Sequence, residues 1–308
     1  MQLRDYMYVI AIAEQGSFTK AAKHLYITQS ALSQGVSKLE VELGTKLFIR
    51  ETTPITLTQA GEILLKDSYA ILQIYGNIPK KIADLEHLCT GRLNIGISEF
   101  YCRYYFSKVI PLFRKKYPGI ELHITEEISS VLEKMILRGN LDLSIFSRPD
   151  KSPLIDYEPI FDEPFLFATP KNHPLNKEHE NNNIALSLFA HEDFIMIKEG
   201  QRMRNISMDL CSQAGFEPNI IFETRSAETV NAFIAAGMGV GFVPDAVRLV
   251  TLKEQQAAYF NLKNQNTTRR FVAGFMKGGY LSNAARTFIT FAKQFSSMEE
   301  TKKLINKF

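Results

Sequence analysis

Residues 16–50 decide how the chain begins to fold, and they read GSFTKAAKHLYITQSALSQGVSKLEVELGTKLFIR. Ser17 and Thr28 are good N-caps, and Gly44 is a good helix end, so the stretch predicts two helices joined by the turn 26–28. The preceding residues 3–15 carry apolar side chains at steps of three and four, which predicts another helix that ends at Gly16. The sequence therefore opens with three short helices in close succession.

The last of these helices has two chemically different faces. Leu32, Val36, Leu39 and Leu43 recur at helical steps and form a narrow apolar stripe. The opposite side carries short hydroxyls and amides where a surface helix usually carries Glu and Lys, which are better helix formers. Side chains of this kind can press into a DNA groove and hydrogen-bond to base edges. They are Ser30, Ser33, Gln34 and Ser37, with Gln29 at the N-terminal tip.

Two β-like runs follow around residues 51–54 and predict a hairpin wing with Arg50 at its base. Residues 16–50, together with LTQAG at 57–61, closely resemble the N-terminal signature of LysR-type transcriptional regulators. The resemblance implies a winged helix-turn-helix domain over residues 1–58 that binds double-stranded DNA at a pseudo-palindromic operator. It implies DNA contacts by Gln29, Ser30, Ser33, Gln34, Ser37 and Lys38 in the major groove, by Ser17, Thr19 and Arg50 at the backbone, and by Thr28 at the helix start.

This sequence departs from the family pattern in two places. Gly35 stands where relatives usually have a better helix former, which loosens the recognition helix by roughly 1 kcal/mol. The wing reads Glu51-Thr52-Thr53-Pro54, where the family commonly has another basic residue. We therefore expect Arg50 to supply the wing's contact with DNA.

A long helix is predicted for residues 59–90. Leu64, Ile71, Ile78 and Leu85 repeat every seven residues, with Tyr75 and Ile82 beside them, which favours a coiled-coil seam between two copies of the chain. A long helix packed on a globular core is the alternative. The seam implies a homodimer, and two such dimers are expected to form a homotetramer, as the resemblance implies. Pro79 predicts a bend or break near residues 75–79, because proline cannot donate its backbone hydrogen bond.

From residue 91 to 308 strands and helices alternate, which predicts a parallel α/β sheet. This part resembles the effector-binding domain of LysR regulators, similar in architecture to type 2 periplasmic-binding proteins. The strings that carry the resemblance are LNIGIS, RGNLDLSIFS, PFLFATPKNHPL and AAGMGVGFVP. It implies a first lobe of residues 91–162 and 268–300 and a second lobe of residues 163–267. The overall expectation is a mixed α and α/β protein.

A small-molecule effector is expected between the lobes, where strand ends and helix N-termini meet. Ser130-x-x-Glu133 instead matches a capping box, a purely structural motif. A carboxylate at position 99 would repel an anion, so a zwitterionic or amine-bearing effector is one alternative. The candidate effector-binding residues are Ser98, Glu99, Phe100, Ser129, Phe146, Arg202, Met203, Arg225 and Ser226.

Other classes of protein fit the sequence less well. It shows no nucleophile–base–acid set, metal cluster or phosphate loop, so we expect neither an enzyme nor a cofactor. Cys89, Cys102 and Cys211 lie far apart, which predicts neither a disulfide nor a zinc site, and a thiol-redox regulator on the same fold remains the alternative function. No export signal or membrane-spanning run is evident, which predicts a cytoplasmic protein. RNA polymerase is an expected partner of such a regulator.

Overall fold

The computed structural model describes the chain apart from residues 86–89, 149–151, 153, 178–181, 264–266 and 298–308. Two compact units are formed. The first comprises Met1–Leu88 with Leu137–Asn140 and Gly278–Ser282, and the second comprises the remaining residues. Among the described residues, no helix is both long enough and apolar enough to cross a membrane.

The first unit begins with the helices α1 (Leu3–Gln15), α2 (Phe18–His24) and α3 (Gln29–Leu43). Local capping sets their ends. The Ser17 and Thr28 hydroxyls each accept a hydrogen bond from a backbone N–H three residues further on. Gly16 and Gly44 end α1 and α3 with positive φ values of 58° and 68°, a conformation that glycine adopts at low cost. The three helices predicted from the sequence are therefore confirmed.

The predicted apolar stripe of α3 packs into the core of this unit. Leu32, Val36 and Leu39 are buried against residues of α1 and α2, whereas Leu43 is exposed, contrary to the prediction. Gly35 has a packing role, because a Cβ atom at this position would lie 2.6 Å from the ring of Tyr8. The glycine that weakens the helix lets α1 lie close against α3.

A buried carboxylate joins α3 to the wing formed by β1 (Phe48–Ile49) and β2 (Thr56–Leu57). Glu40 is only 3% exposed and accepts the backbone N–H of Leu47 at 3.0 Å. Its other oxygen lies 3.0 Å from Lys46 Nζ and 3.4 Å from an Arg50 nitrogen. Burial alone would raise the pKa of Glu40, but the Leu47 hydrogen bond and the two cations outweigh it and lower the pKa.

The helix α4 (Gln59–Leu85) runs without interruption, with Pro79 inside it, so of the predicted bend or break, a break is contradicted. Pro79 removes one hydrogen bond, and the carbonyl group left without it belongs to the exposed Tyr75, where water can solvate it. Ile78 and Ile82 of the predicted seam are exposed, at 46% and 60%. Leu64 was also predicted to lie in the seam, but it packs against the N-terminal core.

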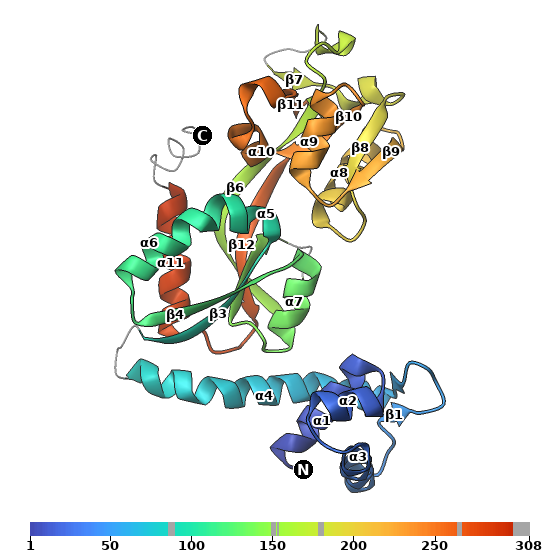
Figure 1. Cartoon of the computed structure of the whole chain (residues 1–308), viewed down its shortest axis with the longest axis vertical. Helices are drawn as coiled ribbons and strands as arrows, with labels where there is room; N and C mark the ends of the chain where they lie inside the picture. The colour runs from blue at the N-terminus through green and yellow to red at the C-terminus, as the bar shows by residue number, and fades with distance from the viewer. Residues whose placement is uncertain (86–89, 149–151, 153, 178–181, 264–266, 298–308) are drawn as a thin grey trace. The chain divides into compact units, whose positions relative to one another are not determined.

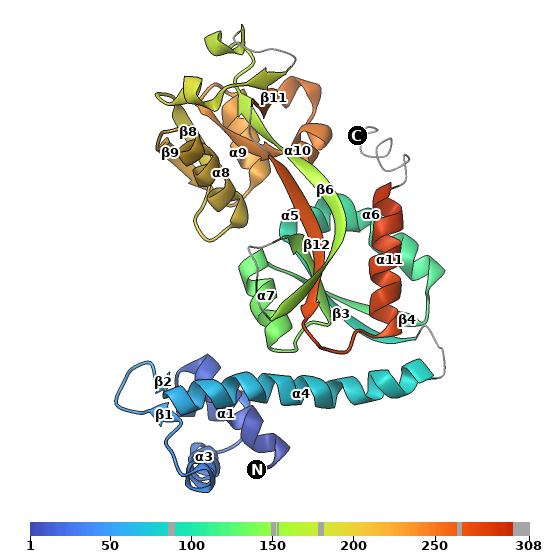
Figure 2. The same cartoon turned by 180° about the vertical axis from the view of Figure 1, so that it is seen from behind.

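The second unit is built on one large mixed sheet with two lobes (Figures 1 and 2). Two sets of parallel strands are joined through two long strands that run antiparallel to each other. The first-lobe strands are β3 (Gly91–Ile97), β4 (Ile120–Glu126) and β5 (Leu143–Ser147); the second-lobe strands are β8 (Asp193–Ile197), β9 (Asn219–Thr224) and β10 (Val240–Pro244); the long strands are β6 (Ile155–Thr169) and β12 (Thr268–Met276).

Antiparallel pairing of β12 with β5 and of β6 with β10 corrects the expectation of a purely parallel sheet. The expected lobe boundary after residue 162 falls inside β6, which pairs with β12 along its first part and with β10 and β11 (Ala258–Leu262) along its second. β6 and β12 are therefore shared by both lobes. The short strand β7 (Asn183–Ile184) and β11 were not predicted from the sequence.

Helices cover this sheet in both lobes (Figure 1). In the first lobe α5, η1 and α6 follow one another directly from Glu99 to Lys116. The helices are α5 (Glu99–Tyr101), the π-helical η1 (Cys102–Phe106), α6 (Ser107–Lys116), α7 (Ser129–Leu137), α8 (Arg202–Gln213), α9 (Ala227–Ala235), α10 (Asp245–Val250) and α11 (Asn283–Ser297), with 3₁₀ turns η2 (Pro174–Lys177), η3 (Leu186–Phe189) and η4 (Lys253–Gln255).

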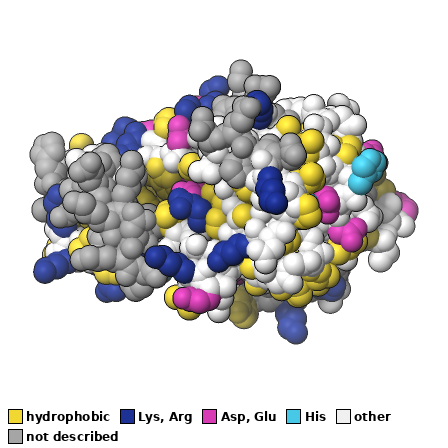
Figure 3. Space-filling model, turned by 90° about the horizontal axis from the view of Figure 1, so that it is seen from above, with side chains coloured by type: hydrophobic (Ala, Val, Ile, Leu, Met, Phe, Trp, Pro, Cys, Tyr) yellow, Lys and Arg dark blue, Asp and Glu magenta, His cyan; other side chains and the backbone are white. Residues whose placement is uncertain are grey.

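Surface charge is mixed on the face seen in Figure 3. Lys and Arg side chains are scattered there in small groups, with Asp and Glu side chains between them. This agrees with the small net charge of +3 for the chain. A net charge this small does not by itself indicate binding to nucleic acid.

Replacing Glu40 by Gln should destabilise the first unit, because the variant loses a buried, charge-assisted set of hydrogen bonds. We expect a loss of about 1.5–3 kcal/mol in the protection of α3 amides against hydrogen exchange at pH 7. The control is Glu42→Gln, which removes an exposed ion pair with the N-terminus and should cost less than about 1 kcal/mol.

The same carboxylate predicts a pH dependence. Its pKa in the folded protein is lowered, so its stabilising effect is complete above the unfolded value, near 4.3, and is lost as pH falls through the folded value. Acid should therefore unfold the wild-type N-terminal unit more steeply than that of Glu40→Gln. Equal acid sensitivity of the two proteins would contradict this role for Glu40.

Candidate functional site

The polar face predicted for α3 lies at the surface. Ser30 and Gln34 are exposed, and Ser33 and Ser37 are half-buried, on the side of α3 away from the buried Leu32 stripe. Gln29 and Lys38 are also exposed, as is Thr19 at the start of α2. The structure thus gathers the candidate DNA-binding side chains of α3 on one accessible face.

Several of the candidate DNA-binding residues also have structural partners. Ser17 and Thr28 use their oxygens as helix caps, and Thr28 is 3.1 Å from the Ser30 hydroxyl. The Arg50 guanidinium lies 4.8 Å from the Phe18 ring centre and contacts Glu40, with its side chain 39% exposed. Arg50 is therefore held in place while its charge stays accessible to solvent.

Tyr26 was missed by the sequence analysis as a candidate surface residue. It lies in the turn between α2 and α3, has a positive φ of 57° and is 96% exposed. A tyrosine so exposed in a turn of this kind is available to a DNA backbone, to which tyrosine hydroxyls can donate. The apolar periodicity used to predict the helices gives no signal for a residue outside them.

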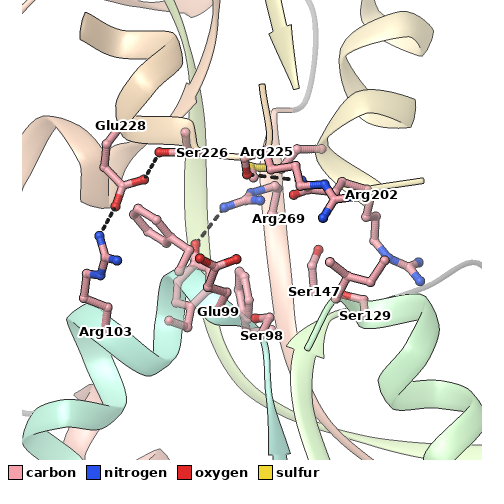
Figure 4. A pocket seen from close by; sticks show the side chains of 17 residues that line it. Ser98, Glu99, Arg103, Ser129, Ser147, Arg202, Arg225, Ser226, Glu228 and Arg269 are labelled. Atoms are coloured by element: carbon pink, nitrogen blue, oxygen red, sulfur yellow. Dashed lines mark hydrogen bonds and ion pairs between the residues drawn. The ribbon is translucent and has the colours of Figure 1, made fainter. Parts of the chain in front are cut away.

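A cavity of about 130 Å³ lies between the lobes of the second unit (Figure 4). It is lined by eight of the nine residues proposed from the sequence to bind an effector. The complete lining is Ser98, Glu99, Phe100, Tyr101, Arg103, Ile128, Ser129, Ser147, Gln201, Arg202, Met203, Arg225, Ser226, Ala227, Glu228, Arg269 and Phe271.

Phe146, the ninth proposed effector-binding residue, does not line this cavity. Its side chain is fully buried, packs against Tyr157 and lies where a Cβ atom on Gly274 would meet it. Ser147, the next residue of β5, lines the cavity instead. Successive side chains of a strand point to opposite faces of the sheet, so only one of these two adjacent residues faces the cavity, and the prediction of Phe146 is wrong.

The serines around the cavity differ in how they are used. The Ser226 hydroxyl caps α9 by accepting the Thr229 N–H at 3.1 Å, and it donates to Glu228 at 2.9 Å. The Ser98 hydroxyl oxygen is buried and has no hydrogen-bond partner among the residues that the structure describes. Because an unpaired buried hydroxyl is costly, Ser98 is suited to bind a polar group that enters the cavity.

Two ion pairs and a hydrogen bond connect the lobes across the cavity. On one side Arg202 at the start of α8 contacts Glu133 of α7 at 2.6 Å. On the other side Arg103 of η1 contacts Glu228 of α9 at 3.3 Å (Figure 4). The hydroxyl of the neighbouring Tyr104 donates to the same carboxylate at 2.9 Å. Burial raises the pKa of Glu133, and the positive charge of Arg202 opposes that rise only in part.

The contact of Glu133 with Arg202 overturns the capping box predicted for Ser130. α7 begins at Ser129, so Ser130 lies inside the helix, and the Glu133 carboxylate reaches across to the other lobe. The Ser130-x-x-Glu133 pattern describes only neighbouring residues, so it could not reveal that Glu133 contacts Arg202, 69 residues further along the chain.

Tyr101, Glu163 and Arg269 form a buried cluster beside the cavity. They belong to α5, β6 and β12, and each is no more than 6% exposed. One Arg269 nitrogen contacts the Glu163 carboxylate and donates to the Tyr101 hydroxyl at 2.6 Å, while Tyr101 donates to Glu163. Burial raises the pKa of Tyr101 well above its ordinary value, so the phenol stays protonated as this arrangement requires.

Arg269 has a further donor that this cluster does not use. Its Nε–H has no partner within the described parts of the chain, and the same holds for Nε of Arg202. Both side chains line the cavity. The sequence analysis missed Arg269, because a single arginine in a predicted strand gives no sign that it is buried.

The two cysteines that the structure describes, Cys102 and Cys211, are poorly suited to redox chemistry. Burial, with the charge of Glu126, raises the pKa of Cys102 to about 11, and burial raises that of Cys211 to about 12. A reactive cysteine needs the opposite shift, since the thiolate is the nucleophile. Cys89 lies outside the described residues. No group of three or more His, Cys, Asp or Glu side chains in the described part of the chain could hold a metal ion.

Comparison with known proteins agrees with this architecture. Residues 88–297 match the family model described as "LysR substrate binding domain", and residues 3–62 match "Bacterial regulatory helix-turn-helix protein, lysR family". The uncharacterized HTH-type transcriptional regulator YcgK of Bacillus subtilis is 31% identical over 316 residues, which cover 98% of this chain and 96% of YcgK.

Two further comparisons extend over most of the chain. A hydrogen peroxide-inducible genes activator of Pectobacterium carotovorum is 30% identical over 245 residues, which cover 79% of this chain and 80% of the activator. The crystal structure of full-length CbnR in complex with its target DNA covers 96% of this chain and 100% of CbnR, with a TM-score of 0.59 and 20% identity, a likeness of fold. The two family matches and the near full-length relative show that this chain belongs to the LysR family of DNA-binding transcriptional regulators.

Proposed function

We propose that this protein binds a specific operator as a dimer through the polar face of α3 and that a small molecule in the cavity between the lobes controls this binding. The observation that carries the proposal is the presence of buried, unpaired donors at that cavity, on Ser98, Arg202 and Arg269. Native proteins rarely leave buried donors unpaired, so a ligand that accepts their hydrogen bonds would be bound selectively.

The DNA contacts in this proposal fall into two groups. Ser33, Gln34 and their neighbours on α3 would read base edges, because they are polar and lie on the solvent-accessible face of the helix, with Gln34 exposed and Ser33 half-buried. Ser17, Thr19 and Arg50 would contact phosphates and set the position of α3, without reading sequence. Thr28 would orient the first turn of α3 through its contact with Ser30.

Self-association through α4 would present two copies of α3 to the two halves of a pseudo-palindromic operator. Exposed apolar side chains on α4 support this part of the proposal, since water-exposed stripes of this size usually mark an interface. They are Ile74, Tyr75, Ile78, Ile82 and Leu85, with exposures of 46–78%. From the family we further propose that such dimers pair into tetramers and that the DNA-bound protein acts on RNA polymerase.

Gln34→Ala should weaken binding to the operator by about 1–3 kcal/mol and leave binding to random DNA unchanged, because a base-edge contact is lost. Arg50→Ala should weaken binding to both DNAs and reduce the dependence of log K on log salt concentration by about 1, because one phosphate contact is lost. Gel-shift titrations over a range of salt concentrations measure both effects. The control is Gln213→Ala, an exposed position at the end of α8.

Equal losses on operator and random DNA for Gln34→Ala would contradict the proposed role of α3. Since Arg50 also contacts Glu40, its affinity change alone is ambiguous, and the salt dependence is the decisive measurement for that residue.

A ligand would control DNA binding if its affinity differed between two arrangements of the lobes. A molecule that bridges the lobes binds one arrangement of them better than another and shifts the population toward it by that difference. The paired charges at both sides of the cavity, Arg202 with Glu133 and Arg103 with Glu228, are contacts that such a shift would change.

Ser98→Ala tests the cavity as the ligand site. A screen of metabolites by thermal shift on the full chain should find a ligand, and the substitution should weaken it by about 1–2 kcal/mol, because one hydrogen bond is lost. The melting temperature of the free variant should stay the same or rise, since the hydroxyl has no partner to lose. Ser130→Ala, outside the cavity, is the control.

Undiminished affinity of that ligand for Ser98→Ala would place its site elsewhere. A ligand that binds the cavity and leaves the operator affinity unchanged would refute its regulatory role.

A thiol response to oxidants is the second candidate function, since relatives named hydrogen peroxide-inducible genes activators are about 30% identical to this chain. The raised pKa values of Cys102 and Cys211 speak against it, because few of these thiols would ionise near neutral pH.

Alkylation by iodoacetamide measures the ionisation of these thiols. At pH 7.5 Cys102 should react roughly 100-fold or more slowly than a cysteine in an unfolded peptide, and its rate should keep rising toward pH 10 as the thiolate forms. Mass spectrometry of the labelled peptides separates Cys102 and Cys211 from Cys89. Rates for Cys102 equal to those of the free peptide would revive the redox function.

A further inference from the structure

We propose that the ligand of the cavity is a small zwitterion of the α-amino-acid class, with its carboxylate on the buried donors of Ser98, Arg202 and Arg269 and its ammonium group on Glu99. This inference rests on the proposed function of the cavity as a ligand site. It adds the charge, the orientation and the size of the molecule that would bind there.

The carboxylate end is indicated by the kinds of atom left unpaired. Two of the three buried atoms are guanidinium N–H groups, which can only donate, and the third is a hydroxyl, which can donate. Arg269 is 5% exposed, so its unpaired Nε–H is largely shielded from bulk solvent. A carboxylate presents several lone pairs within a small space and makes strong bonds to charged donors. An uncharged amide or sugar would satisfy fewer of these donors.

The ammonium end is indicated by Glu99. Three carboxylates at the site are committed, Glu133 to Arg202, Glu163 to Arg269 and Glu228 to Arg103. The Glu99 carboxylate has no hydrogen bond or ion pair with any described residue, although it interacts electrostatically with Arg103, one helical turn further on. In Figure 4 its carboxylate points from the start of α5 into the space between the lobes. It is therefore available to accept from a cationic group on the ligand.

Charge balance supports a ligand without net charge. The lining holds four guanidinium groups, on Arg103, Arg202, Arg225 and Arg269, and two carboxylates, on Glu99 and Glu228. Glu133 and Glu163 neutralise two of the guanidinium groups from just behind the lining, which makes four carboxylates in all. A dicarboxylate would leave uncompensated negative charge in a partly desolvated site, and a simple amine would leave the buried donors unpaired.

The size of the cavity limits the rest of the molecule. Its volume of about 130 Å³ is slightly less than that of a cavity, about 150 Å³, that accommodates benzene. Phe100, Met203 and Phe271 provide an apolar part of the wall. These features fit an amino acid with a short side chain and exclude large aromatic effectors from this arrangement of the lobes.

The test is isothermal titration calorimetry on the full-length protein with four matched series of compounds. These are the small L-α-amino acids from alanine to leucine, the same molecules without the amine, the same molecules without the carboxylate, and dicarboxylates of three to five carbons. At least one amino acid should bind, at least tenfold more tightly than its deaminated or decarboxylated counterpart and than any dicarboxylate.

Glu99→Gln should lower the affinity for that amino acid at least tenfold, since the ammonium contact is removed, and it should not lower the affinity for the deaminated counterpart, an anion that the Glu99 carboxylate repels. Glu217→Gln is the matched control, because Glu217 is exposed and lies outside the cavity lining, and it should bind all series like the wild type. The exposed position of Glu99 makes a folding defect in the variant unexpected.

Preferred binding of a dicarboxylate or an amine, or no binding in any series, would overturn this inference. If a ligand of another charge class binds, is weakened by Ser98→Ala and changes operator affinity, the inference fails while the proposed function stands. If an amino acid binds as described but the operator affinity does not change, the inference stands and the proposed function fails.

Discussion

The buried contact of Arg269 with Glu163 and Tyr101 is the interaction on which the second unit depends. It joins β12, β6 and α5 where the two long strands pass between the lobes, and the N–H of Ala246 at the start of α10 adds a hydrogen bond at 3.3 Å. Loss of one partner would leave an uncompensated buried charge, a cost of about 3–5 kcal/mol. This cluster therefore fixes one wall of the cavity.

The contacts across the cavity differ from this cluster in exposure. The Arg103 side chain is 66% exposed, so its pair with Glu228 is screened by solvent and contributes at most about 1 kcal/mol. The pair of Arg202 with Glu133 is more buried, with side chains 22% and 20% exposed. This combination of one buried cluster and two more exposed ion pairs suits a two-lobed binding site. A ligand can change the exposed ion pairs without breaking the buried cluster.

The helix-turn-helix could be predicted from the sequence, because contacts between residues close together in the chain determine where its helices begin and end. Ser17 and Thr28 cap helices through contacts three residues away, and Gly44 ends α3 through its own backbone conformation. The role of Glu40 was missed, because its partners appear only when the chain folds back to form the wing. Local rules also failed for Pro79, whose missing hydrogen bond is tolerated on an exposed part of α4.

The cavity was predicted in outline and missed in detail. Its serines and arginines lie at strand ends and helix starts, positions that the alternation of strands and helices makes visible in the sequence. β5 is buried along its whole length, so its sequence shows no alternation that would tell Phe146 from Ser147. Arg269 and Glu163 are 106 residues apart, and nothing in a single sequence connects them.

The central claim is that occupation of the cavity changes how the protein holds its operator. DNase I footprints and DNA bend angles on one operator, measured with and without a ligand of the cavity, test it most directly. The account predicts a change in footprint length or bend angle for the wild type, and none for Ser98→Ala at a ligand concentration that no longer fills its cavity. Identical footprints and bends for the wild type at saturating ligand would contradict it.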